Sequence, residues 1–282
     1  MSSIFHWTAS GIRLAAEVEG PEGAPTVVML HGGGQTRHAW AGASTRLAAL
    51  GYRVIRCDTR GHGDSGWAAD GDYSLEALAD DLRALRATID GPVALVGASL
   101  GGLTSFYALG THEHEEELAQ ALVLVDVVLR PQREGVQRIK RFMSANPDGF
   151  ASLEDVADAI AAYNPDRPRA KNLDGLLKNV RLGPDGRYRW HWDPTLLVGM
   201  DDPEDRTDQL FAISHRVTLP TLVLRGQRSD VVDQRGVEEM RELLPHLEVE
   251  EIGGAGHMIA GDRNDAFVNA IGGFLTRHFP VE

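Results

Sequence analysis

Residues 93–103 read V-A-L-V-G-A-S-L-G-G-L and decide the fold. A run of small and branched apolar residues leads to Gly97, as in a buried strand, and a helix-like segment follows. Between them Gly97-Ala98-Ser99-Leu100-Gly101 matches G-x-S-x-G, which in a strand–turn–helix context is typical of a nucleophile elbow. A glycine-rich turn that carries a serine by chance is the alternative. The strand and the helix on either side favour a reactive Ser99, with the helix amides directed at any anion formed there.

Composition excludes several classes of partner. The 282-residue chain has 28 basic and 41 acidic residues, a net charge of −13, which argues against nucleic acid and anionic membranes. The sequence contains no run of about 18 apolar residues, the length needed to span a membrane. The first eight residues lack the pattern of a secretory signal. The single cysteine, Cys57, lies in an apolar run and forms no internal disulfide, so we expect a cytoplasmic protein.

Short apolar runs alternate with helical patterns along most of the chain, which predicts a mostly parallel, doubly wound α/β sheet. We expect strands at 26–30, 52–57, 93–97, 122–127 and 221–225, with a more exposed one at 247–252 near an edge. Helices are expected at 75–85, 234–244 and 263–278, the first capped by Ser74. Residues 4–20 are more polar, and we interpret them as an antiparallel hairpin on the sheet's edge.

The alternation stops between residues 129 and 216, where helical segments replace the strand signals. So long an insertion between two strands is too ordered to be a loop. We interpret 129–216 as a mainly helical cap over the carboxyl ends of the strands, and 1–128 with 217–282 as the core.

A serine needs a positioned base, and the base needs an acid that holds its tautomer. Of eleven histidines, His257 stands out, because it follows a strand in the glycine-rich stretch I-G-G-A-G-H-M. Asp230 follows the strand at 221–225 and completes the order Ser99, Asp230, His257. Asp126, at the end of L-V-L-V-D-V, is the rival acid. The run H-E-H-E-E-E at 112–117 is interpreted as a solvated helix end, so no metal site is expected.

Acyl transfer also needs donors for the oxyanion. His31-Gly32-Gly33-Gly34 follows directly on the strand at 26–30, and its glycines let backbone N–H groups approach a reacting carbonyl. We expect the amides of Gly33 and Leu100 to form the oxyanion hole, with Gly34 as the alternative to Gly33.

With these residues the chain resembles the α/β-hydrolase superfamily over nearly its whole length. The likeness rests on residues 31–34, D-T-R-G-H-G-D-S at 58–65, the elbow, the Asp230 loop and Gly256-His257. It implies that the turn from Arg60 to Ser65 is structural and shapes the loop beside the oxyanion hole. Capped esterases, lactonases, carbon–carbon hydrolases and perhydrolase-like members are the most similar. Epoxide hydrolases and haloalkane dehalogenases use aspartate at the elbow, where this chain has Ser99.

The expected function is hydrolysis of a carboxylic ester or lactone of a small, largely apolar substrate through an acyl-enzyme on Ser99. No metal or cofactor is required. The alternatives are a carbon–carbon hydrolase, a cofactor-free perhydrolase or haloperoxidase-like enzyme, and a small-molecule receptor with slow or absent turnover. Trp190 and Trp192 would share a face of an extended segment, where they line the substrate pocket or form cap core. The sequence does not determine the oligomeric state, and a homodimer is one possibility.

Overall fold

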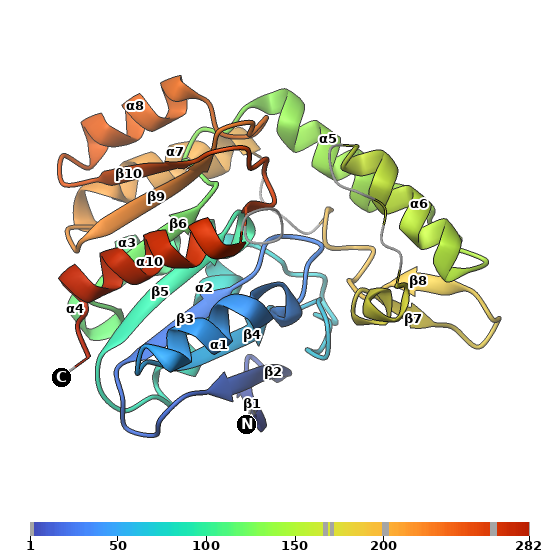
Figure 1. Ribbon diagram of the computed structural model, residues 1–282, viewed down its shortest axis with the longest axis horizontal. Helices are drawn as coiled ribbons and strands as arrows, with labels where there is room; N and C mark the ends of the chain where they lie inside the picture. The colour runs from blue at the N-terminus through green and yellow to red at the C-terminus, as the bar shows by residue number, and fades with distance from the viewer. Residues whose placement is uncertain (1–2, 166–168, 170–171, 199–202, 260–263, 282) are drawn as a thin grey trace.

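A computed structural model describes residues 3–165, 169, 172–198, 203–259 and 264–281. Its centre is an eight-stranded sheet with the order β1-β2-β4-β3-β5-β6-β9-β10 (Figure 1). Only β2 runs antiparallel to its neighbours in this sheet; the remaining pairs are parallel. The strands are β1 (Ser3–Ala9), β2 (Ile12–Glu19), β3 (Thr26–Leu30), β4 (Arg53–Asp58), β5 (Val93–Ala98), β6 (Ala121–Val125), β9 (Thr221–Gly226) and β10 (Glu248–Ile252).

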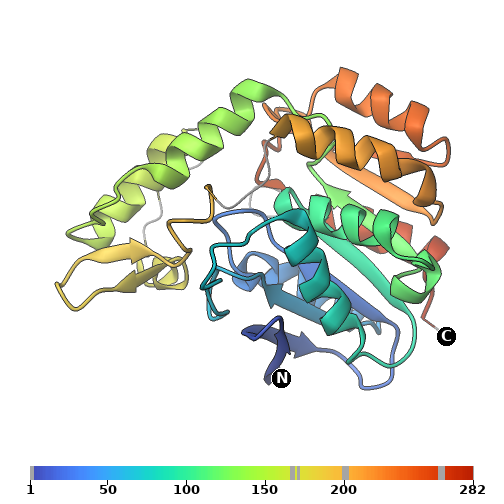
Figure 2. The ribbon, with the colours of Figure 1, turned by 180° about the vertical axis from the view of Figure 1, so that it is seen from behind.

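Helices cover both faces of the sheet. One face carries α1 (Ala41–Ala49) and α10 (Asn264–His278), and the other carries α2 (Leu75–Arg86), α3 (Leu100–Thr111), α7 (Pro203–Ile213) and α8 (Gln234–Leu243) (Figures 1 and 2). Short elements complete this layer: η1 (Arg37–Trp40), α4 (Glu115–Leu118) and η3 (Ser214–Arg216). Because the central strands β3 and β6 are covered on both sides, they are buried at every position, which explains their continuous apolar character.

Helix α2 has the N-cap and the buried face that the sequence predicts. The Ser74 hydroxyl caps α2 by accepting the Ala77 N–H at 3.3 Å, and the leucines spaced three and four apart form the buried face. The doubly wound sheet, the N-terminal hairpin β1–β2 and the edge position of β10 agree with the sequence-based predictions. None of the helices that the structure describes combines the length and the apolar character needed to cross a bilayer.

The insertion after β6 forms a cap at the end of the sheet where the parallel strands finish (Figure 1). It consists of α5 (Arg133–Ser144), α6 (Leu153–Tyr163), η2 (Asp174–Lys178) and the hairpin β7 (Val180–Leu182) with β8 (Tyr188–Trp190). It has its own apolar cluster, which includes Phe150, Val156, Leu176 and Val180. A capping box between Ser152 and Asp155 begins α6.

The cap is shorter than the predicted 129–216. Helix α7 and η3 pack against α3, and Leu210 is fully buried in the main core with the strands. Residues 203–216 therefore form a layer of the sheet rather than part of the cap. The sequence could not show this, because helical periodicity reports which face of a helix is buried but not what covers it.

Candidate active site

Ser99 lies on the sharp turn between β5 and α3, with φ 43° and ψ −112°. Residues other than glycine rarely adopt this backbone conformation, which costs about 1–3 kcal/mol. The surrounding structure must therefore hold Ser99 in it. The flanking glycines explain how the turn closes. A Cβ on Gly97 would collide with the backbone carbonyl of Gly101, and one on Gly101 would collide with the carbonyl of Leu30. The strand–turn–helix geometry predicted for residues 93–103 is therefore confirmed.

His257 lies five positions beyond β10 and is paired with Asp126. Its Nδ1 is 2.6 Å from Asp126 Oδ2, and the two side chains are 10% and 0% exposed. A carboxylate only accepts hydrogen bonds, so Nδ1 carries a proton, and in the neutral ring the lone pair is then on Nε2. Ser99 and His257 line the same cavity.

The acid on His257 is therefore Asp126, which corrects the expected partner Asp230. Asp230 is more than a third exposed, and its carboxylate forms an ion pair of 2.9 Å with Arg138 of the cap helix α5. Chain order alone favours neither aspartate, because both stand between Ser99 and His257. Position in the sheet decides: Asp126 follows β6 immediately, between β5 and β9, whereas Asp230 lies four residues beyond β9.

Two further donors hold Asp126 in place. Oδ1 accepts the N–H of Gly226 at 2.8 Å, and Oδ2 accepts the hydroxyl of Ser229 at 2.5 Å. The aspartate itself is in the left-handed region, with φ 49°, and its N–H donates to Leu224 O at 2.7 Å. Ser229 was not singled out from the sequence. Its only signal there is its place three residues after a strand, at the end of the sheet where Ser99 lies.

In the glycine loop after β3, two of the three backbone N–H groups donate hydrogen bonds within the protein and one does not. The N–H of Gly32 donates to Gln35 Oε1 at 3.0 Å, and the N–H of Gly34 donates to His62 Nε2 at 3.1 Å. Gly34 is thus engaged, which removes it as the alternative oxyanion donor. The Gly33 N–H has no acceptor among the described residues, and the first N–H of α3, from Leu100, has none within the helix.

Three buried histidines shape this loop. His31 accepts the Thr59 N–H at 3.1 Å, His62 accepts the Gly34 N–H, and His191 accepts the Gly63 N–H at 2.8 Å. Each accepting nitrogen must be unprotonated, so all three rings are neutral. Burial lowers the pKa of all three, and that of His191 to about 3. His62 thus acts as expected for the Arg60–Ser65 turn, which supports the loop beside Ser99.

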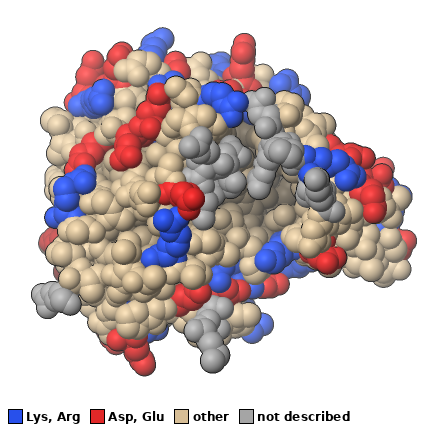
Figure 3. Space-filling view, viewed as in Figure 1, with Lys and Arg blue, Asp and Glu red and all other residues tan. Residues whose placement is uncertain are grey.

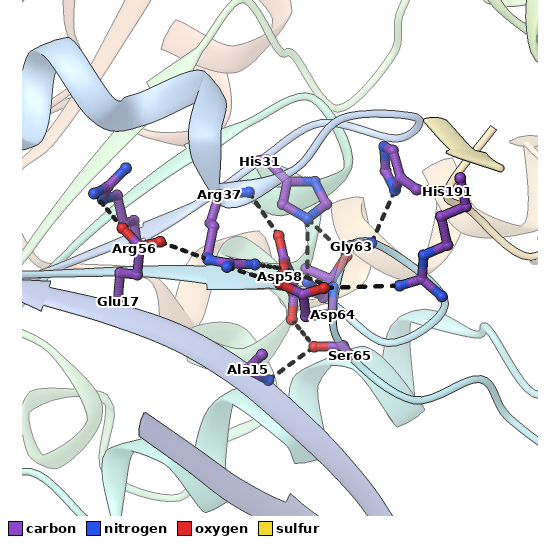
Figure 4. A network of polar contacts seen from close by, with 12 residues as sticks. Ala15, Glu17, His31, Arg37, Arg56, Asp58, Gly63, Asp64, Ser65 and His191 are labelled. Atoms are coloured by element: carbon purple, nitrogen blue, oxygen red, sulfur yellow. Dashed lines mark hydrogen bonds and ion pairs between the residues drawn. The ribbon is translucent and has the colours of Figure 1, made fainter. Parts of the chain in front are cut away.

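A buried charge network anchors the same loop to the sheet (Figure 4). Arg37, just after the glycines, forms ion pairs with Glu17 on β2, with Asp58 at the end of β4, and with Asp64 at 2.8 Å. Arg56 binds the other oxygen of Glu17. Breaking such a buried pair by removing one partner costs about 3–5 kcal/mol, so the network holds the loop in one arrangement.

Above Ser99 a cavity of about 460 Å³ lies between the core and the cap. Figure 3 shows a hollow between these two parts of the molecule. Trp190 and Trp192 line it and stack with ring centroids 4.8 Å apart, beside Phe142 and Met143 of α5. Both tryptophans also pack in an apolar cluster that joins the cap to the core, since it includes Met143 of α5 as well as Ala68 and Tyr73. Gly34 lines the cavity as well.

Residues 25–263 match the family model described as the alpha/beta hydrolase fold. The chain belongs to this family.

Individual relatives extend the comparison. An esterase of Mycobacterium tuberculosis is 31% identical over 259 residues, covering 89% of this chain and 83% of the relative. A mouse sn-1-specific diacylglycerol lipase is 26% identical over 275 residues, with 92% and 83% covered. The crystal structure of an α/β hydrolase from Novosphingobium aromaticivorans superposes with a TM-score of 0.81 at 28% identity, with 98% of each chain covered.

Proposed function

We propose that this α/β hydrolase is a serine esterase that cleaves a carboxylic ester or lactone through an acyl-enzyme on Ser99. One observation carries the proposal: Ser99 on the strained elbow lines the same cavity as His257, whose ring is paired with the buried Asp126. The relatives named as an esterase and a diacylglycerol lipase support the same bond type.

In the proposed mechanism, His257 Nε2 takes the proton of the Ser99 hydroxyl as Oγ attacks the carbonyl carbon. The carbonyl oxygen becomes an anion, and the amides of Gly33 and Leu100 stabilise it. Asp126 stabilises the imidazolium that forms. The imidazolium then gives its proton to the leaving alcohol oxygen as the carbon–oxygen bond breaks.

Water completes the cycle by the same route in reverse. His257 removes a proton from water, the hydroxide attacks the acyl carbon, and Ser99 leaves with the proton returned by the imidazolium. The carboxylic acid product departs. Over the full cycle one proton passes from water through His257 to Ser99, and the Ser99 proton passes through His257 to the leaving alcohol, so the enzyme returns to its starting state.

Cavity size and lining define the substrate class. A volume of about 460 Å³ accommodates a small molecule, and the walls are mainly aliphatic and aromatic, including Leu103, Ile139, Phe142 and Met143. These features favour a small, largely apolar acyl or alcohol group beside the scissile ester.

The test compares Ser99→Ala with a matched serine variant on the surface. Ser144→Ala removes an exposed hydroxyl at the end of α5 and should keep full activity on p-nitrophenyl esters. Ser99→Ala should lower kcat by at least about 10³-fold, because removing the nucleophile leaves only binding and oxyanion stabilisation. An active Ser99→Ala protein would overturn the proposal.

Fluorophosphonate titration separates turnover from binding. The wild-type protein should be inactivated in proportion to labelling, and should release many equivalents of p-nitrophenol per active site when it is not labelled. A single equivalent without further turnover would support the receptor alternative and contradict the esterase proposal.

A further inference from the structure

Cationic side chains reach the cavity from the cap and from α7. Lys140 on α5 and Lys178 at the end of η2 line it, as does Arg206 on α7. The described residues that line the cavity include no aspartate or glutamate. This is unusual for a chain with a net charge of −13, in which acidic residues outnumber basic ones.

The use of lysine in this chain is concentrated at the same place. The sequence contains only three lysines, at positions 140, 171 and 178, and two of them line the cavity. The other cationic side chains apart from histidine are arginines, and many of the described ones form ion pairs with carboxylates. Lys140 and Lys178, in contrast, have no described carboxylate within ion-pair distance.

The surroundings of the two ammonium groups suit an anion. Lys140 is half-buried on a helix whose neighbouring residues, Ile139 and Phe142, give the cavity apolar walls. Low polarity around a charge strengthens its attraction for an opposite charge. Asn164 and Asn179 add amide groups to the lining. His38 adds no positive charge at neutral pH, because burial, and then the charges of Arg37 and Lys178, lower its pKa.

We propose that the natural substrate carries an anionic oxygen group, a carboxylate or a phosphate, which Lys140 and Lys178 bind while the ester lies at Ser99. The inference rests on the proposed esterase function and adds the charge of the substrate to it. The substrate then spans the cavity: the ester is at the core side, an apolar segment crosses between Phe142 and the tryptophans, and the anion lies beneath the cap. Figure 3 shows lysine and arginine side chains near the edge of the hollow.

The experiment compares two p-nitrophenyl esters that share the same acyl chain. Mono-p-nitrophenyl adipate ends in a carboxylate, and methyl p-nitrophenyl adipate masks that charge, so p-nitrophenolate release compares the same reaction with and without the anion. For the wild-type protein kcat/KM should be at least about 10-fold higher for the anionic ester, since one hydrogen bond to a charged group strengthens binding by about that factor. Raising the salt concentration should reduce this preference, because Lys178 is solvent-exposed and its charge is therefore screened.

Variants assign the preference to the two lysines. Lys140→Met and Lys178→Met keep the length and apolar stem of the side chain but remove the charge. Each should lower kcat/KM for the anionic ester several-fold, the double variant by about 10-fold or more, with the neutral ester changed by less than about 2-fold. Arg141→Met is the matched control: it removes a charge from an exposed neighbour on α5 that does not line the cavity.

Inhibition then identifies the anion. Hexanoate and hexyl phosphate should both compete with the neutral ester, and both should bind more weakly to the double variant. The inhibitor that binds more tightly to the wild-type protein shows whether the site prefers a carboxylate or a phosphate. The inference is overturned if the wild-type protein hydrolyses the two esters equally well or prefers the neutral one, or if the double variant keeps the preference. Ser99-dependent turnover of the neutral ester in that case leaves the proposed function intact, so the two failures are distinguishable.

Discussion

Replacing Asp126 and Asp230 separately with asparagine tests which acid serves His257. In Asp126→Asn the amide oxygen stays with the Gly226 N–H, which is 2.8 Å from Oδ1. The amide NH2 then faces His257 Nδ1 and the Ser229 hydroxyl, where Oδ2 accepts both at present. A donor opposite Nδ1 forces the proton of the imidazole onto Nε2, and the ring can no longer accept the proton of Ser99.

The wrong tautomer should lower kcat by about 10³–10⁴-fold, which corresponds to about 4–5.5 kcal/mol of transition-state stabilisation. Asp230→Asn removes only a partly exposed ion pair with Arg138, with side chains 37% and 42% exposed. A pair of this kind is worth about 0–1 kcal/mol, so activity should change less than about 5-fold.

The assay is steady-state hydrolysis of a short p-nitrophenyl ester, with circular dichroism to show that both variants fold. The pairing of His257 with Asp126 is refuted if Asp230→Asn loses activity by 10³-fold or so while Asp126→Asn keeps it. Equal and small losses in both would also refute it, because no acid would then be essential.

Three further outcomes follow from the contacts. Ser229→Ala should lower kcat about 10-fold with little change in KM, because Asp126 loses a hydroxyl donor at 2.5 Å; an unchanged kcat would show that Ser229 does not position the acid. Gly33→Ala should fold and keep its amide, since a Cβ there makes only ordinary contacts, whereas Gly34→Ala, with φ 75°, should melt several degrees lower; equal melting temperatures would contradict this. Below pH 6.5 the unfolded chain binds a proton that folded His191, with its pKa lowered to about 3, does not. Stability should therefore fall with falling pH, by about 3 kcal/mol from this residue at pH 4.5, and denaturant titrations of His191→Asn should show a flatter profile.

Much of the fold could be read from local signals. The elbow glycines, the Ser74 cap and the continuous apolar strands are each determined within about ten residues, so the sequence shows them directly. Ser99 and His257 were found for the same reason: each is marked by glycines next to a strand end.

The acid could not be found in this way. Asp126 and Asp230 both follow strands, and the choice depends on which strand lies where in the sheet and on a charge in the cap, Arg138, that holds Asp230. Contacts of this kind join residues about a hundred positions apart, and a single sequence carries no signal for them. The predicted end of the cap was wrong for a similar reason, because α7 would be amphipathic whether it covered the sheet or the cavity.

The lysines illustrate a different limit. Their positions in the sequence, within helical segments, are typical of solvent-facing residues, and only the closure of the cap over the sheet turns Lys140 toward a cavity. Charge inside a pocket is a property of several elements together and emerges only when they are assembled.

Peptide mass mapping after brief exposure to an activated ester shows whether Ser99 is the residue that carries the acyl group. An acyl-enzyme on Ser99 predicts one acyl group per chain, on the peptide that contains Ser99, which appears and disappears at the rate of turnover and is absent from Ser99→Ala. An acyl group on any other residue at that rate, or steady turnover with Ser99 never modified, would contradict it.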